Sequence, residues 1–324
     1  MQQDGPLNLY LQSLAFTANV TAPIFFIVFL GIFLKRIRLI DDNFVATASK
    51  LVFTLTLPAL VFMAIIRTDF QAVFDLHQLI YLVAGTVSTY LVLWWLAARW
   101  IKDGRDRGVF IQGAFRGNYG IVGLAVAYNL FGDSGLAQGA ILLAMVIPLY
   151  NTLSIICLTL PIQQGKKLDL NQALLEILKN PLILAVLFAL PISILQLELP
   201  TILDKTGQYF ANLTLPLALL AIGGSLSLKS LRDTSAQATW ATASKLVILP
   251  AILTFGAWLY GFNDQQLAML FVLFGCPTAA ASFVMAKGMG GNAQLAANIV
   301  LTTTLGSTLT LSAGIYLFRV WGII

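Results

Sequence analysis

Apolar residues in this chain gather in stretches of about 20 residues, the length that an α-helix needs to cross a lipid bilayer. Short polar segments separate ten such stretches, which cover residues 18–37, 51–69, 79–98, 109–131, 136–160, 178–197, 207–228, 241–262, 265–286 and 295–318. The pattern predicts an all-α membrane protein with ten transmembrane helices, five in each half of the chain.

The composition agrees with a membrane setting. Of the 324 residues, 58% are hydrophobic and only 10% are charged, and the mean hydropathy is +0.85. A water-soluble domain has about 25% charged residues. The composition therefore excludes a soluble protein and makes the lipid bilayer the expected surrounding. The formal net charge of +5 indicates loops that face anionic lipid, and no nucleic-acid partner is expected.

The two halves of the chain resemble each other at an offset of 158 residues. Three landmarks share this offset: Pro23 with Pro181, Leu55–Pro58 with Leu213–Pro216, and Asn118–Gly120 with Cys276–Thr278. Because each half has an odd number of predicted helices, the second half enters the bilayer from the opposite side, and the repeat is inverted. We expect a first repeat over residues 1–160, a short cytoplasmic connector over 161–177 and a second repeat over 178–324.

Basic residues lie mainly in the loops after the odd-numbered stretches. Those loops hold fifteen of them: Lys35, Arg36, Arg38, Lys50, Arg99, Lys102, Arg105, Arg107, Lys166, Lys167, Lys179, Lys229, Arg232, Lys245 and Lys287. The even-numbered loops and the termini hold three, namely Arg67, Lys205 and Arg319. By the positive-inside rule, the odd-numbered loops are cytoplasmic and both chain termini are outside.

Helix-breaking residues interrupt the fourth and the ninth stretch. The fourth holds Gly117, Gly120 and Gly123, and the ninth holds Pro277. Glycine permits dihedral angles that a helix does not use, and proline removes a helical donor. Backbone groups that are freed in this way are costly in lipid, so they must be buried in protein or line a cavity.

Each break begins a new half-helix, whose unpaired amides and positive dipole end suit an anion. If the two stretches cross at their breaks, two such ends meet, and a carboxylate is the expected ligand. Pro58 and Pro216 are predicted as matching breaks in the second and seventh stretches. The alternative is that all these residues form kinks that only improve packing, because glycine and proline are frequent in membrane helices.

Arg116 is the one charged residue that we place well inside a stretch. An ionisable group within the membrane is by default a candidate for function. The alternatives are that its guanidinium extends to the cytoplasmic interface or caps free carbonyls at the end of the first half-helix.

Further candidates for substrate contact are polar or lie at the breaks: Asn118, Tyr119, Gly120, Asn151, Cys276, Pro277, Thr278, Thr56 and Thr214. An asparagine in lipid needs partners for two donors and an acceptor. For the hydroxyl groups, a bond to a carbonyl one turn earlier or to a neighbouring helix is the simpler explanation.

Acidic residues are missing from the middle of the stretches. All fourteen lie in loops or at stretch ends, and the sole histidine, His77, lies in an outer loop. Proton relays in membranes usually use Asp, Glu or His, so a carboxylate-based coupling site is disfavoured. We expect no catalytic residue, metal site or cofactor, whereas sodium held by backbone carbonyls and hydroxyl groups stays open.

The chain resembles the auxin efflux carrier family of membrane transporters over essentially its whole length. The resemblance rests on Pro23, Thr56–Pro58, Asn118–Gly123, Asn180–Pro181, Pro216 with Gly223–Ser225, and Pro277. It implies two inverted five-helix repeats in which broken helices four and nine cross. Helices one, two, six and seven would form a scaffold, and helices three to five and eight to ten a transport bundle. The short connector favours a compact bacterial member in the inner membrane, although Leu124–Val126 stands where many bacterial relatives have a proline.

Together these features predict a secondary carrier that moves a small organic anion by alternating access. The anion would be an auxin-like monocarboxylate or a dicarboxylate such as malate or malonate. Export is favoured, because moving one negative charge outward gains about 2.3 kcal/mol per 100 mV. The alternatives are a sodium-coupled organic-anion symporter of the bile-acid type and a channel or sensor. An intramembrane enzyme is disfavoured because the sequence holds no nucleophile or metal motif. A homodimer is left open.

Overall fold

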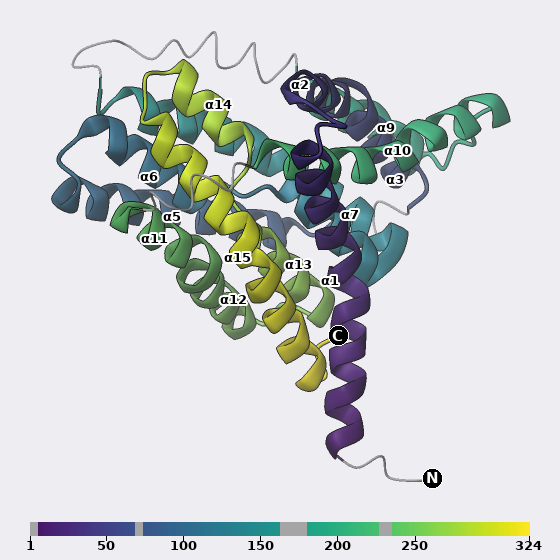
Figure 1. Cartoon of the computed structure of the whole chain (residues 1–324). Helices are drawn as coiled ribbons and strands as arrows, with labels where there is room; N and C mark the ends of the chain where they lie inside the picture. Colours follow the sequence, from purple (N-terminus) through teal and green to yellow (C-terminus); the bar gives the residue numbers. More distant parts are fainter. Residues whose placement is uncertain (1–5, 69–73, 163–179, 227–234) are drawn as a thin grey trace.

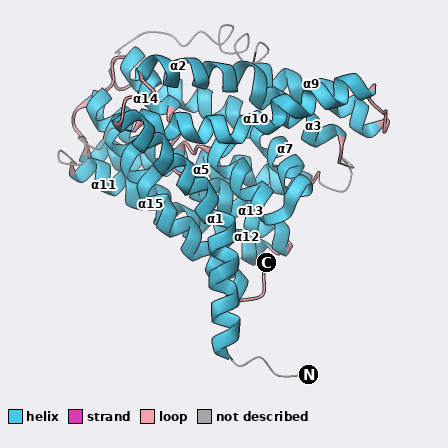
Figure 2. Cartoon of the chain, turned by 45° about the vertical axis from the view of Figure 1, so that its right-hand side comes forward, coloured by secondary structure: helices cyan, strands magenta, loops and turns pink. Residues whose placement is uncertain are grey.

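The computed structural model describes residues 6–68, 74–162, 180–226 and 235–324. Nearly all of this described chain is helical, and it holds no strand beyond a single isolated bridge (Figure 2). The helical segments are α1 (Pro6–Arg36), α2 (Asp42–Leu51), η1 (Val52–Thr56), α3 (Leu57–Ile66), α5 (Leu76–Trp100), α6 (Gly104–Phe115), η2 (Tyr119–Gly123), α7 (Leu124–Thr159), α9 (Pro181–Ile194), α10 (Thr201–Ser225), α11 (Ala236–Ala243), η4 (Ser244–Ile248), α12 (Leu249–Tyr260), α13 (Asp264–Gly275), α14 (Ala281–Gly288) and α15 (Ala293–Val320). The three η segments are single π-helical turns.

Six helical stretches are long and apolar enough to cross a membrane. Within the described residues they are Tyr10–Arg36, Asp42–Ile66, Leu76–Trp100, Tyr119–Thr159, Ala236–Tyr260 and Ala293–Val320. The chain is therefore a multi-pass membrane protein. The full count of ten spans stays a prediction, since the predicted seventh stretch lies in the more polar α10 and the predicted ninth is divided between α13 and α14.

Large apolar side chains cover much of the outer surface. Phe26, Phe188 and Leu309 are 70%, 68% and 75% exposed, whereas a soluble protein seldom exposes a contiguous apolar surface of this kind. Lipid is the medium in which such side chains are stable, so their outward direction supports the membrane assignment independently of helix length.

The helices pack in two groups (Figure 1). On one side of the molecule α1 packs against α10, and α3 packs against both α9 and α10. On the other side α6 packs against α5 and α7, α12 against α13, and α15 against α11 and α14. Contacts of α1 with α15 and of α3 with α7 join the groups. Both termini lie toward the end of the molecule away from α2 (Figures 1 and 2).

Glycines allow α1 and α10 to approach each other closely. A Cβ atom at Gly31 would lie 3.0 Å from the Cα of Gly223 and would collide with the carbonyl oxygen of Leu220. A Cβ at Gly223 would in turn collide with the carbonyl oxygen of Val28. Small residues are typical of helix interfaces in membranes, where close van der Waals packing replaces the hydrophobic effect.

Of the matching breaks predicted at Pro58 and Pro216, the one at Pro216 is wrong. Pro23 and Pro216 lie inside α1 and α10, which continue past them as single helices. A proline removes one backbone hydrogen bond and crowds the preceding turn, but neighbouring helices can compensate within a membrane protein. Pro58 is the second residue of α3, and the π-helical turn η1 just before it interrupts the regular α-helix at this place. Pro181 begins α9 behind an Asn180 cap.

The fourth and fifth predicted stretches meet at Gly132. This residue has φ 60° and ψ −143° inside the segment Leu124–Thr159, a conformation that glycine adopts readily and other residues do not. The segment is thus two helices divided where the hydrophobic pattern predicts a boundary, between residues 131 and 136.

A glutamine network ties α5, α7 and α13 together near the ends of these helices. Gln138 Nε2 donates to Gln78 Oε1 at 2.9 Å, and Gln265 Nε2 donates to Gln138 Oε1 at 3.0 Å. Gln266 Nε2 donates to Asp75 Oδ2 at 2.9 Å. These bonds connect three helices of one group.

Asp75 caps α5 and should make stability depend on acidity. Its carboxylate accepts from the Gln78 backbone N–H, and this bond holds the pKa of Asp75 below its ordinary value of 3.8. A lowered pKa stabilises the fold above the ordinary value, and the contribution is lost as pH falls through the folded-state pKa. We expect Asp75→Ala to lower the free energy of unfolding by about 1 kcal/mol at neutral pH.

The measurement is the apparent Tm of purified protein between about pH 7 and pH 3. The gap between the wild type and Asp75→Ala should close toward the acid end, while Asp75→Asn, which keeps a capping oxygen, should lie between them at neutral pH. A gap that is constant over the whole range would contradict the assignment.

Candidate functional site

The fourth and the ninth predicted stretches are both interrupted. α6 ends at Phe115, and the chain leaves the helical conformation at Arg116 (ψ 108°) before η2 begins at Tyr119. α13 ends at Gly275, Cys276 is extended (ψ 144°), and α14 begins at Ala281. Two short non-helical segments, 116–118 and 276–280, therefore lie within apolar surroundings.

The two interruptions pair with each other. The backbone N–H of Asn118 donates to the carbonyl oxygen of Pro277 at 2.7 Å, and that of Ala279 donates to the carbonyl oxygen of Arg116 at 3.3 Å. Gly117 and Thr278 form an isolated antiparallel bridge between these bonds. Backbone groups that lose their helical partners at each break thus satisfy each other, as burial away from water requires.

The glycines of the first break act through space, not through unusual dihedral angles. None of Gly117, Gly120 and Gly123 has a positive φ, which corrects the reason for which they were singled out. A Cβ at Gly117 would lie 3.2 Å from Lys245 Nζ, and one at Gly123 would collide with the Tyr119 ring. Gly120 has room for ordinary contacts. Gly117 therefore permits close packing at the junction, and Gly123 makes room for an aromatic ring.

A cavity of about 290 Å³ lies beside the junction. Its walls come from both groups of helices. The group of α6, α7 and α14 contributes the breaks Arg116–Ile121 and Ala279–Ala281 and, from α7, Leu143, Val146, Ile147, Tyr150 and Asn151. The group of α3, α9 and α10 and the segments beside it contribute Ser49, Val52, Phe53, Leu57, Asn180–Leu182, Ala218, Ala221, Ile222 and Ser225. The segments that follow the two breaks share this one cavity. This is the arrangement in which the start of two helices can act on one ligand.

Arg116 brings a positive charge to the cavity wall. Its side chain is 9% exposed, and Nη1 donates to Ser154 Oγ at 3.1 Å and to Met285 Sδ at 2.9 Å. Both partners are neutral, and the ion pairs within the described chain involve other residues. The guanidinium therefore neither reaches the surface nor caps a carbonyl, and it has no acidic partner among the described residues.

Two asparagines and a tyrosine add polar groups to the same wall. Within the described parts of the chain, no hydrogen bond engages the side-chain amides of Asn118 and Asn151. Tyr150 packs edge-on against Phe115, with ring centroids 5.6 Å apart. The predicted candidates Arg116, Asn118, Tyr119, Gly120 and Asn151 thus meet at one cavity.

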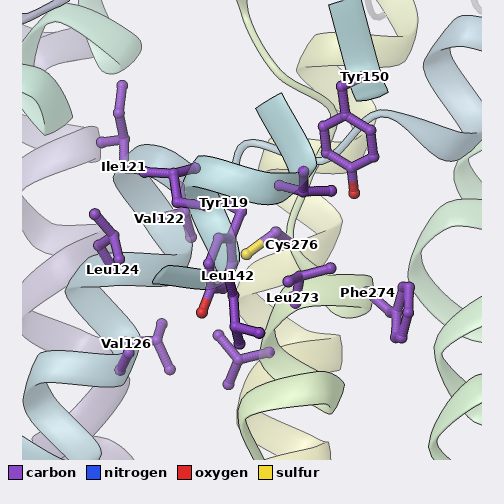
Figure 3. Packing of buried hydrophobic residues seen from close by; sticks show 14 of the residues in the cluster. Tyr119, Ile121, Val122, Leu124, Val126, Leu142, Tyr150, Leu273, Phe274 and Cys276 are labelled. Atoms are coloured by element: carbon purple, nitrogen blue, oxygen red, sulfur yellow. The ribbon is translucent and has the colours of Figure 1, made fainter. Parts of the chain in front are cut away.

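The remaining candidates do not line this cavity. Cys276 lies beside the Tyr119 ring in the buried cluster (Figure 3), and the carbonyl oxygen of Pro277 accepts the backbone N–H of Asn118. Thr278 Oγ1 donates to the Gly113 carbonyl at 2.6 Å, and Thr214 Oγ1 donates to the Phe210 carbonyl within its own helix. Thr56 is fully buried beside Leu57. These residues lie in the protein core around the cavity and do not face it.

Lys245 is the residue that sequence reasoning misplaced. It was assigned to a cytoplasmic loop, but it lies in η4, is 2% exposed, and Nζ donates to the carbonyl oxygen of Phe274 at 2.7 Å. A lysine near the start of a transmembrane stretch normally indicates a position at the membrane–water interface. The available signal was its position inside the predicted stretch 241–262.

Comparison with known proteins places the chain among transporters. Residues 17–173 and 167–315 match a family model described as Membrane transport protein. An uncharacterized transporter of Methanothermobacter thermautotrophicus is 22% identical over 288 residues, which cover 88% of this chain and 93% of that protein. The uncharacterized transporter YfdV of Escherichia coli is 23% identical over 313 residues, 94% of this chain and 99% of that protein.

A third relative carries a substrate in its name. A protein of Rhizobium meliloti, named "Putative malonate transporter", is 25% identical over 315 residues, which cover 93% of this chain and 95% of that protein. These names are those of membrane transporters and not of enzymes, and a transporter implies a small-molecule substrate. The chain belongs to the Membrane transport protein family, the auxin efflux carrier family that its sequence resembles.

Proposed function

We propose that this protein is a secondary carrier for a small organic anion, which it binds at the junction of the two broken helices. The observation that carries the proposal is the Arg116 guanidinium, held by neutral partners on the wall of a 290 Å³ cavity. A buried charge without a counter-ion is costly. A carboxylate would supply the missing counter-charge and pair with the planar guanidinium through two parallel hydrogen bonds.

The lining of the cavity favours a carboxylate on a compact, largely apolar body. Among the described residues that line the cavity, Arg116 is the one with a charge, and most of the others, such as Val52, Leu143 and Ile222, are apolar. A second carboxylate would have to be met by the amides of Asn118 and Asn151. The name of the Rhizobium relative makes malonate the first dicarboxylate to test beside the monocarboxylates.

The packing of the helices supports alternating access. The cavity lies between the group that contains α3, α9 and α10 and the group that contains α6, α7 and α14. A second cavity of about 320 Å³ lies between the groups as well, lined by Pro23, Asn129, Asp133 and Asn212 among others. We take the first group as the scaffold and the second as the moving bundle, each built from both halves of an inverted ten-helix repeat.

The proposed orientation places the 290 Å³ cavity toward the cytoplasm of a bacterial cell. The cavity includes Ser49 and Asn180, which flank predicted cytoplasmic loops, and the termini lie toward the opposite end of the molecule. With the membrane potential negative inside, one negative charge gains about 2.3 kcal/mol per 100 mV on leaving the cell. The potential therefore favours export without a coupling ion, and the scaffold face is open to pairing as a homodimer.

The decisive experiment is flux of radiolabelled carboxylates in proteoliposomes under a potential set with potassium and valinomycin. We expect saturable transport that grows with the potential in the direction that moves negative charge toward the positive side. Transport that requires sodium would favour a symporter of the bile-acid type, and unsaturable conductance in planar bilayers would favour a channel. If no mono- or dicarboxylate moves, the proposal is wrong.

Asn118→Ala should weaken substrate binding without unfolding the protein. A hydrogen bond to a charged ligand contributes roughly 1.5–3 kcal/mol, so we expect KM for the transported carboxylate to rise about tenfold or more. Asn118 pairs with Pro277 through its backbone, which the substitution keeps. The matched control is Asn43→Ala on the exposed face of α2, and an unchanged KM in Asn118→Ala would remove Asn118 from the site.

A further inference from the structure

Lys245 lies deep in the molecule on a segment that differs from an ordinary helix. It is the tenth residue of the apolar stretch Ala236–Tyr260, which places it about 13 Å along the helix axis at 1.5 Å per residue. The π-helical turn Ser244–Ile248 contains it. Such turns widen the helix and occur frequently at functional sites.

The ammonium group meets the end of α13. The last carbonyls of a helix have no partner within it and carry the negative end of its dipole. α13 ends at Gly275, and Lys245 Nζ donates to the carbonyl oxygen of Phe274 at 2.7 Å. The space next to Gly117 is bordered by this Nζ and by the carbonyl oxygen of Leu273, which lie 3.2 and 3.4 Å from the position that a Cβ of Gly117 would take.

Carbonyls at the end of a broken helix are the groups that hold sodium in many secondary transporters. In this chain the Lys245 side chain already donates to one of them, the carbonyl of Phe274. We propose that Lys245 is a tethered cation, a positioning residue whose ammonium group occupies a monovalent-cation site at the end of α13 and fixes the paired breaks. The carrier then needs no sodium or other free cation at this place.

The inference rests on the proposed function only for its effect on transport; the cation site itself can be tested without a substrate. Lys245→Ala removes the ammonium and leaves a space that ends at the Phe274 carbonyl. Methylammonium chloride and NaCl are the probes, each compared with choline chloride, whose cation is too large for that space. The readout is the apparent Tm of purified protein in detergent.

We expect methylammonium to raise the apparent Tm of Lys245→Ala by about 3 °C or more relative to choline, because a ligand that binds only the folded state stabilises it. The wild type should not respond. Two controls separate the cation site from general effects: Leu246→Ala opens a cavity in the same turn without removing charge, and Lys287→Ala removes an exposed lysine. Equal responses of Lys245→Ala and these controls would overturn the proposal.

A second variant keeps the proposal testable if Lys245→Ala does not fold. Lys245→Met fills the space without a charge, so it should fold but lose carboxylate transport about tenfold or more, with no rescue by any cation. Transport by the wild type should be equal in sodium and in choline. The Lys245 proposal is overturned if wild-type transport depends on sodium, or if Lys245→Met transports like the wild type. If the wild type transports no carboxylate at all, the proposed function is contradicted, and the thermal test of the cation site still stands.

Discussion

Arg116→Gln is expected to raise KM for the transported carboxylate at least about thirtyfold, because removing one partner of a buried, hydrogen-bonded charge pair costs about 2–5 kcal/mol. The glutamine keeps a donor near Ser154 but cannot neutralise a carboxylate. Initial rates of radiolabelled carboxylate uptake into proteoliposomes, measured over a range of substrate concentrations, give KM directly.

The same substitution should leave the protein folded and at least as stable in the absence of substrate. Arg116 has no acidic partner in the described chain, so its charge opposes folding and contributes only when an anion binds. Loss of transport with an unchanged or higher apparent Tm therefore distinguishes a binding residue from a structural one. This combination of effects is typical of functional residues that lower stability.

Two further variants sharpen the test of Arg116. Arg116→Lys keeps the charge but not the planar pair of donors, so its KM should lie between those of the wild type and Arg116→Gln. Arg99→Gln removes an arginine from the exposed end of α5 and should transport like the wild type. If Arg116→Gln has a KM within about threefold of the wild type, or if it unfolds, the role of Arg116 is structural and rests on its contacts with Ser154 and Met285.

Much of the site could be predicted because its cause is local. Three glycines around an asparagine in one apolar stretch, and a proline in another, weaken a regular helix and mark where it is most easily interrupted. The breaks at 116–118 and 276–280 are therefore present in the structure where the sequence predicts them. The candidates Asn118 and Asn151 could be placed on the same reasoning, since unpartnered amides are not tolerated against lipid.

Other features depend on neighbours that the sequence does not reveal. Pro216 stays within a continuous helix because packing against α1 and α3 offsets one missing hydrogen bond. Thr278 has the same polar character as Asn151, but the nearby Gly113 carbonyl accepts its hydroxyl and removes it from the cavity. Lys245 could be recognised only once α13 was seen to end beside it.

Gly223→Ala is expected to abolish the yield of monodisperse protein, although it adds a single methyl group. The added Cβ would meet the carbonyl oxygen of Val28 and the Cα of Gly31, which are backbone atoms and cannot move aside by a change of rotamer. Overpacking usually costs about 1–3 kcal/mol when side chains can adjust. Here the whole of α1 must separate from α10, so we expect a larger loss, measured as the monodisperse fraction and apparent Tm in detergent.

Gly288→Ala is the matched control, since its Cβ would meet nothing within 4 Å and the residue lies at the exposed end of α14. Gly31→Ala should reproduce the defect, because its Cβ would meet the carbonyl oxygen of Leu220 from the other side of the same interface. If Gly223→Ala folds with the apparent Tm of the wild type, α1 and α10 are not in backbone contact. An interface that admits no methyl group cannot slide during transport without separating, so its intolerance would assign α1 and α10 to one rigid body. The contacts of α1 with α7 and α15, and of α3 with α7, would then be the surface along which the bundle moves.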